Sequence, residues 1–175
     1  MSNHDRGGEN ANSALVVTVR PEDFSSKDVL GGIEFQRKYE SLAFKSGNGA
    51  APVQRSKDFM EDKISNSFGN VNPTFTGKVN FAMLSDCLPE FVTRTLKDGL
   101  ENFEHKMKGF MTEGLMTGVE MRTSAPVRIV RDKEMQSLNV KGLYPLGEGA
   151  GYAGGIVSAA VDGIKGALQI LTNKE

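Results

Sequence analysis

The 175-residue sequence predicts an α+β fold, and three observations lead to this class. Segments near 29–44, 87–104 and 156–171 place apolar residues at helical spacing. Short runs rich in β-branched residues suit strands, but few of them resemble the strands of a parallel sheet. The stretch 45–83 is rich in Gly, Asn, Ser and Pro, and only short pieces of it are expected to be regular.

Composition limits the classes of protein to which the chain can belong. With 38% hydrophobic and 25% charged residues, the sequence can bury one core and at most a small appendage. The 21 basic and 22 acidic residues are interspersed, so we expect no nucleic-acid partner. No apolar stretch reaches the roughly 20 residues of a membrane span, and the polar start MSNHDRGGENANS is unlike a signal peptide. We therefore expect a cytoplasmic protein without a membrane partner.

The sequence offers few residues for metal binding or nucleophilic catalysis. Cys87 is the single cysteine and lies beside an acid, so a buried apolar role is the preferred interpretation. His4 and His105 are the only histidines, and both are expected at the surface. No metal site is predicted.

The first half of the chain begins with thirteen polar residues that are predicted to form a disordered loop. The run ALVVTV at 14–19 predicts a buried strand, which Pro21 would end. A helix is then expected over 29–44, weakened at its start by Gly31 and Gly32.

The helix predicted over 87–104 has the firmest pattern. Ser85 or Asp86 is expected to cap it, and Pro89 suits its first turn. Its apolar face, which we interpret as core packing, is formed by Leu88, Phe91, Val92, Leu96, Leu100 and Phe103.

The last third of the chain leads to a glycine-rich turn. The segment 114–130 predicts two extended pieces joined at TSAP, followed by a polar connector. LYPL at 143–146 then predicts a strand, which enters a turn over 147–155 and a helix from Ile156 to about Leu171. Such a turn delivers backbone N–H groups and the positive end of a helix dipole to one point, which favours an anion.

Gly149, Gly151 and Gly154 formally match the dinucleotide fingerprint G-x-G-x-x-G. That fingerprint should open a βαβ unit of about 30 residues, with an acidic residue about 20 positions further on. The sequence after Gly154 predicts one helix and no second strand. The turn is therefore not the principal motif of a self-contained Rossmann domain.

The last helix is apolar around most of its circumference. Its strongly polar side chains, Asp162, Lys165 and Gln169, form a narrow stripe, and Gly163 and Gly166 allow close packing. Such a helix requires burial on several sides. We infer that part of its packing surface is missing from this chain.

Two blocks, GVEMRTSAPVRIVRD and GLYPLGEGAGYAGGIVSAAVDGI, resemble the C-terminal region of bacterial FAD-dependent dehydrogenases of unknown substrate. These proteins are distant relatives of the glutathione-reductase-like flavoproteins. NANSALVVTVRPEDF, GIEFQRKYESLAF and LPEFVTRTLKDGLENFEHKMKGF resemble the middle region of the same family. The resemblance implies an inserted substrate domain over 1–130. It also implies a closing strand, turn and helix over 131–175, which complete a Rossmann-like FAD-binding domain.

The resemblance assigns roles to the turn. It implies that the acid of the Gly147-Glu148 pair holds hydroxyl groups of the cofactor, and that the helix start faces the flavin pyrimidine edge. For Tyr152, ring contact and packing both remain open. The implied cofactor-binding residues are Gly147, Glu148, Gly149, Ala150, Gly151, Tyr152, Gly154, Gly155 and Ile156.

The resemblance also places Arg122, Thr123, Ser124 and Arg128 near substrate or flavin, although an edge strand with solvated arginines explains them equally well. No catalytic acid or base can be named, because the hydride chemistry belongs to the cofactor. NAD(P)H is the implied electron donor.

The chain is accordingly expected to be a C-terminal fragment that is inactive alone and holds FAD only together with the N-terminal half of its polypeptide. Two alternatives remain. The chain is a non-catalytic domain that binds an anion or nucleotide, or it is a structural domain that forms a homodimer through its last helix.

Overall fold

The computed structural model describes residues 4–24 and 28–172 and divides the chain into two compact units. Unit 1 consists of Met1–Arg20 and Arg37–Met121, and unit 2 of Pro21–Gln36 and Arg122–Glu175. The boundary between Gln36 and Arg37 falls within a helix. The division into 1–130 and 131–175 stays a prediction.

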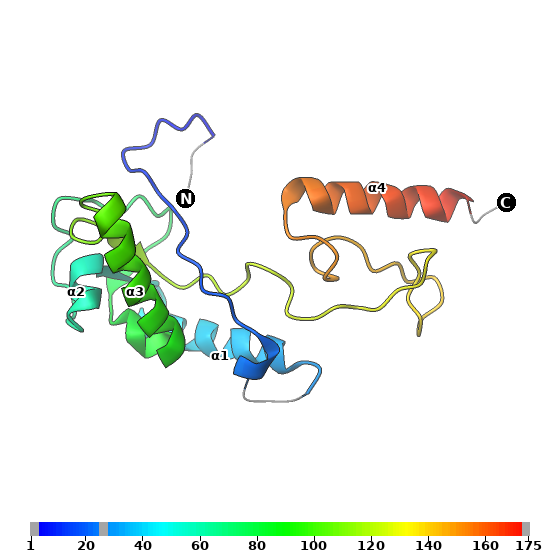
Figure 1. Cartoon of the computed structure of the whole chain (residues 1–175), viewed down its shortest axis with the longest axis horizontal. Helices are drawn as coiled ribbons and strands as arrows, with labels where there is room; N and C mark the ends of the chain where they lie inside the picture. The colour runs from blue at the N-terminus through cyan, green and yellow to red at the C-terminus, as the bar shows by residue number, and fades with distance from the viewer. Residues whose placement is uncertain (1–3, 25–27, 173–175) are drawn as a thin grey trace. The chain divides into compact units, whose positions relative to one another are not determined.

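Unit 1 is built on a small mixed sheet, which confirms the α+β class. The central strand β1 (Ala51–Arg55) pairs in parallel with β2 (Val79–Phe81) and antiparallel with β3 (Leu115–Thr117). Figure 1 labels the α-helices of the described residues. Val53 is the common point of the register, opposite Phe81 on one side and Thr117 on the other. β1 and β2 lie in the stretch expected to be mostly irregular, where strands of five and three residues are too short to show a period.

The helices were predicted more accurately than the strands. The structure contains α1 (Gly31–Ser46), α3 (Glu90–Lys106) and the short α2 (Ser56–Met60). The pattern expected for the second helix is confirmed at Val92, Leu96 and Leu100, which α3 buries. It is wrong at Phe103, which is exposed near the end of the helix. The unit 1 core is formed by the three buried residues of α3 with Ala43, Phe59, Leu84 and Cys87.

The predicted cap of α3 is wrong. Ser85 and Asp86 belong to a separate 3-10 turn, η2 (Leu84–Cys87), and α3 begins after Pro89 without a side-chain cap. The 3-10 turn occupies the positions expected for the cap because Leu84 and Cys87 are both buried. In addition, the Leu84 N–H donates to Gln54 Oε1 at 2.9 Å.

Gln54 connects the central strand to its surroundings although it is completely buried. Its Nε2 group donates to the Lys63 carbonyl at 2.7 Å, while its Oε1 accepts from Leu84. A buried amide is stable only when it is satisfied in this way. These two bonds fix β1 to the segments on either side of it.

Cys87 lies in the core, which confirms its interpretation as a buried apolar residue. Burial, with a smaller contribution from Asp86, raises the pKa of the Cys87 thiol to about 11. Because the thiolate is the reactive form, we expect Cys87 to react with Ellman's reagent at pH 8 at least about a hundredfold more slowly than in denaturant. Equal rates in native and denatured protein would contradict this expectation. Both histidines, His4 and His105, are exposed as predicted.

The strand predicted at 14–19 does not form. Residues 4–19 contain no helix or strand, and residues 1–3 lie outside the described part. Leu15 and Val17 pack against the core of unit 1 while Val16 and Thr18 are exposed. The alternation that predicted a strand is therefore real, but no segment among the described residues pairs with it to make a ladder.

The second half of the predicted extended region differs as well. β3 supplies the first extended piece, but 122–130 contains no strand, and only an isolated bridge joins Arg131 to Ser137. Residues 143–146 also form no strand, because no described segment pairs with them. The turn and the last helix, α4 (Ile156–Thr172), occur where they were expected. Among the described residues, no helix combines the length and apolar character needed to cross a bilayer.

Candidate functional site

The glycine-rich turn of unit 2 has a defined backbone conformation. The Tyr152 N–H donates to the Gly147 carbonyl at 3.0 Å, and the Gly151 N–H donates to the Glu148 carbonyl at 2.9 Å. Ala159 N–H donates to the Gly155 carbonyl at 2.9 Å and closes the first turn of α4. The turn therefore leads directly into the helix, whose first N–H groups have no partner within the helix.

A salt bridge beneath the turn fixes it to α4. Arg131 makes two hydrogen bonds to the Asp162 carboxylate, at 2.8 and 2.9 Å, and a third to the Pro145 carbonyl at 2.8 Å. Asp162 also accepts the Gly147 N–H at 2.8 Å. The side chains of this pair are only 13% and 14% exposed. One ion pair thus joins the connector, the entry to the turn and the middle of α4.

Tyr152 packs within unit 2. The Arg131 guanidinium lies 3.6 Å from the ring centroid and Arg128 lies 5.1 Å from it. The Tyr152 hydroxyl accepts the Arg131 N–H and donates to the Ile129 carbonyl, both at 3.2 Å. Arg128 Nε donates to the Gly151 carbonyl at 3.0 Å. Tyr152 thus packs against two arginines, its contact with a cofactor ring stays a prediction, and the structure brings Arg128 to the turn.

The ion pair makes the stability of unit 2 sensitive to acid. Hydrogen bonds from Arg131 and then Gly147 lower the pKa of Asp162 from 3.8 to about 2. The unfolded carboxylate takes up its proton first, so this contribution, about 2 kcal/mol, is complete above about pH 5 and is lost as the pH falls through 2. We expect the near-UV circular dichroism of the tyrosines to change over this range, and to change less in Asp162→Asn. An unchanged acid profile in that variant would contradict the assignment.

Two glycines of the turn are required by the protein itself. Gly147 and Gly151 have φ values of 71° and 84°, which favour glycine. A Cβ on Gly151 would also lie 2.6 Å from the Val127 carbonyl oxygen. The backbone conformation of the turn therefore requires glycine at both positions, with or without a bound ligand.

The backbone conformation does not require glycine at the other three glycine positions of the turn. Gly149, Gly154 and Gly155 do not have positive φ values. A Cβ would meet nothing within 4 Å at Gly149 or Gly154, and only Ser158 Oγ at 3.7 Å at Gly155. Side chains at these positions would occupy the open space in front of the turn and the start of α4. These glycines therefore fit a ligand that approaches the backbone from outside.

Alanine substitution separates the two groups of glycines. We expect Gly149→Ala and Gly154→Ala to leave the melting temperature of the chain unchanged or slightly raised. Gly151→Ala should lower it, because the φ angle and the contact with residue 127 cost about 1–3 kcal/mol. Differential scanning calorimetry measures the three variants side by side. If Gly154→Ala lowered the melting temperature as much as Gly151→Ala does, the fold itself would require glycine at both positions.

The remaining residues expected at the turn differ in exposure. Glu148 is exposed, and its carboxylate has no hydrogen bond or ion pair among the described residues. Ala150 is buried, and its carbonyl accepts the Ile129 N–H at 3.2 Å. Ile156, the first residue of α4, is 92% exposed. Glu148 and Ile156 are therefore available to a ligand or to another part of a protein.

Arg122, Thr123 and Ser124 are exposed at the start of the second segment of unit 2. Thr123 and Ser124 make no hydrogen bond among the described residues. They lie outside strands, so the edge-strand interpretation does not apply to them. Their proximity to substrate or flavin stays a prediction.

α4 presents an apolar face that its own unit does not cover. The residues Val157, Val161, Ile164, Leu168 and Leu171 recur at helical spacing and are all exposed. The opposite face carries Asp162 and also Gly166, which Leu146 contacts so closely that a Cβ on Gly166 would clash with it. The expected close packing is confirmed at Gly166 but is wrong at Gly163, where a Cβ would meet nothing within 4 Å. Within the polar stripe, Asp162 is mostly covered but Lys165 is exposed, and the apolar side is exposed as well.

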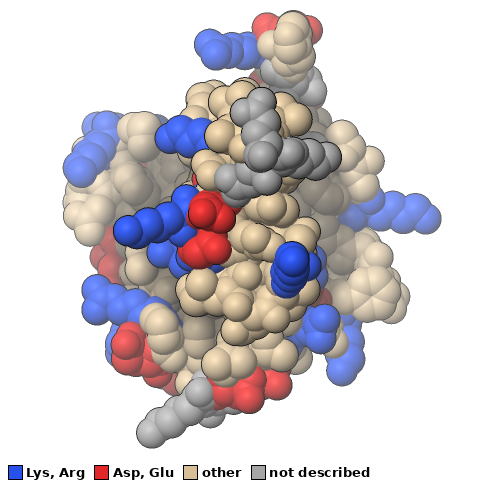
Figure 2. Space-filling model, turned by 90° about the vertical axis from the view of Figure 1, so that its right-hand side faces the viewer, with Lys and Arg blue, Asp and Glu red and all other residues tan. Residues whose placement is uncertain are grey.

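The described charged side chains form neither a basic patch on the face drawn in Figure 2 nor a metal-binding cluster. On the face of the molecule drawn in Figure 2, the described Lys and Arg side chains are scattered and form no single basic patch. No group of three or more His, Cys, Asp or Glu arranged for a metal ion is found in residues 4–24 and 28–172.

Comparisons with known proteins concern both units. The family model described as "FAD-dependent protein, C-terminal domain-like" matches residues 1–123. An uncharacterized protein of Clostridium beijerinckii is 56% identical over 174 residues, which cover 98% of this chain. The aligned residues cover 33% of that relative, so the chain spans about a third of its length.

Proposed function

Because the chain belongs to the FAD-dependent protein C-terminal domain-like family, we propose that it is the C-terminal part of a larger FAD-dependent oxidoreductase. The glycine-rich turn of unit 2 would contact the flavin, and the remaining polypeptide would supply the principal ADP-binding turn. The isolated chain is then inactive. The relative three times its length provides the context in which such a protein would be complete.

The observation that carries this proposal is the open space at Gly149, Gly154 and Gly155. A flat ring or a phosphate can approach a backbone only where side chains are absent. The same place holds the N-terminus of the 17-residue α4, whose dipole favours negative charge such as that on a reduced flavin. The residues present therefore fit the cofactor.

The residues of the chain would bind and orient the cofactor. N–H groups at the start of α4 would face the flavin edge, and Glu148 would accept hydrogen bonds from its hydroxyl groups. Arg131 and Asp162 would hold the turn in place from behind. When bound, FAD supplies the hydride and electron transfer, for which we propose NAD(P)H as the donor.

The test uses a chimera in which this chain replaces the matching third of the clostridial relative. We expect the chimera to retain FAD after gel filtration, seen as visible absorption and flavin fluorescence, while the isolated chain retains none. Gly154→Leu should abolish retention by the chimera without lowering the melting temperature of the isolated chain. Gly99→Leu, a glycine in α3 with a nearest contact of 4.0 Å to the Phe103 ring, is the matched control.

Two results would overturn the proposal. Retention of FAD by the Gly154→Leu chimera would remove the turn from the flavin site. Stoichiometric FAD binding by the isolated chain would favour the alternative of a self-sufficient nucleotide-binding domain.

A further inference from the structure

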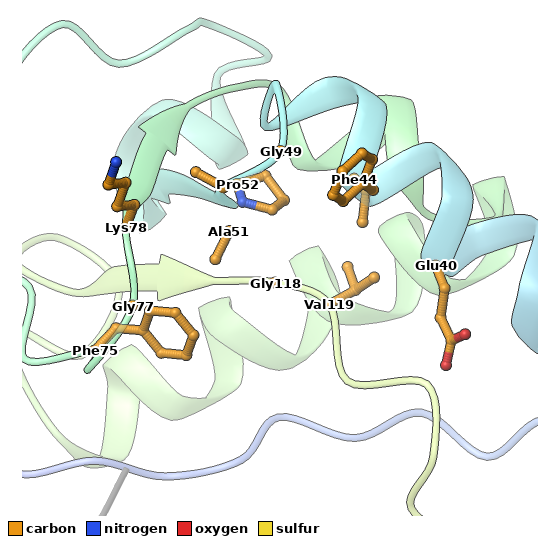
Figure 3. A pocket seen from close by; sticks show the side chains of 12 residues that line it. Glu40, Phe44, Gly49, Ala51, Pro52, Phe75, Gly77, Lys78, Gly118 and Val119 are labelled. Atoms are coloured by element: carbon orange, nitrogen blue, oxygen red, sulfur yellow. The ribbon is translucent and has the colours of Figure 1, made fainter.

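Unit 1 contains an open pocket that the proposed flavin contact does not use. Its volume is about 470 Å³, within the range of small-molecule sites. Its lining comes from the end of α1, the start of β1, the segment before β2 and the segment after β3 (Figure 3). The residues that matter for its chemistry are Glu40, Phe44, Pro52, Phe75, Lys78 and Val119.

Two aromatic rings border the pocket and remain exposed. Phe44 is 67% exposed and Phe75 is 39% exposed. Each ring lies against a glycine: a Cβ on Gly49 would be 3.6 Å from Phe44, and a Cβ on Gly77 would be 2.7 Å from Phe75. Each ring therefore packs on one side against a glycine backbone. Exposed aromatic surface beside a hollow is typical of a binding site for a flat apolar group.

The two charged residues at the pocket differ in whether their side chains already have a partner. Lys78 and Glu40 lie at opposite ends of the view in Figure 3. Glu40 already has an interaction partner, whereas the Lys78 ammonium has no ion pair or hydrogen bond among the described residues. The Lys78 ammonium is therefore available to pair with an anion.

We propose that this pocket binds a small organic anion with a flat apolar ring, such as an arylacetate. The ring packs against Phe44, Phe75 and Val119, and the carboxylate pairs with Lys78. This binding requires no cofactor, so it holds or fails independently of the flavin proposal.

The test titrates the 175-residue chain with 4-fluorophenylacetate and follows the ligand by fluorine NMR. We expect saturable broadening with a Kd of about 1 mM, as for a ligand of this size. The neutral amide, 4-fluorophenylacetamide, should bind about two- to fivefold more weakly, because it lacks the charge that Lys78 pairs with. Absence of saturable binding would overturn the proposal.

Variants locate the binding. Lys78→Gln should weaken the acid about two- to fivefold and leave the amide unchanged, while Lys108→Gln, an exposed lysine outside the pocket, should change neither. Phe44→Ala should weaken both ligands about tenfold, because it removes one face of the ring contact. Loss of binding in Ile164→Ser but not in Phe44→Ala would place the ligand on α4 and overturn the assignment. Equal binding of acid and amide would overturn the role of Lys78.

Discussion

Asp162→Ala should unfold the glycine-rich turn and leave unit 1 intact. The substitution removes the carboxylate that Arg131 and the Gly147 N–H share, and it leaves a nearly buried guanidinium without its counterion. Removing one partner of a buried pair costs about 3–5 kcal/mol. Because these side chains retain some exposure, we expect about 2–3 kcal/mol here.

Hydrogen exchange followed by mass spectrometry measures this effect locally. Peptides covering 143–155 should lose protection in Asp162→Ala, while peptides from α3 should keep theirs. Asp98→Ala, which removes an exposed carboxylate from α3, is the matched control. Uniform loss of protection across both units would contradict a local role for the pair.

A double substitution separates the role of the pair from that of its charges. Arg131→Met with Asp162→Leu removes both charges together, so no ion is left buried alone. Replacing a buried ion pair by apolar residues is often neutral, and we expect the double variant to be more stable than Asp162→Ala. If the loss of stability in the double variant equals the sum of the losses caused by Arg131→Met and Asp162→Leu alone, the two residues do not act as a unit.

The sequence was informative where a pattern extends over several turns. α1, α3 and α4 were predicted within a few residues because each carries a long apolar period. β1 and β2 were not predicted, because they span five and three residues and pair with each other from positions distant in the chain. The run at 14–19 shows the opposite error, in which alternation reports one-sided packing without strand pairing.

The candidate site divides in the same way. The glycine-rich turn was visible as a cluster, but its glycines could not be sorted into internal and open positions without the backbone angles. Arg131 was part of a connector described only as polar, because the pair that it forms spans 31 positions. The lone acid Asp162 within an apolar helix was the signal that could have indicated a buried partner.

Ile164→Glu should have little effect on the isolated chain but should disrupt the chimera with the clostridial relative. In the isolated chain Ile164 is 62% exposed, so the free energy of unfolding should change by no more than about 0.5 kcal/mol. We propose that in the longer polypeptide proposed above the apolar face of α4 packs against the rest of the chain. A glutamate there would be a buried charge without a partner, which costs several kcal/mol, and the chimera should lose its FAD.

Ile164→Leu keeps the position apolar and is the matched control, since the chimera that carries it should retain FAD. Sedimentation of the isolated chain decides which surface covers the helix. If the chain forms a dimer that Ile164→Glu dissociates while the chimera keeps its FAD, then a second copy covers α4 and the alternative of a homodimer is correct. If only the chimera is affected, the same helix face that is exposed here holds the glycine-rich turn to the rest of the polypeptide.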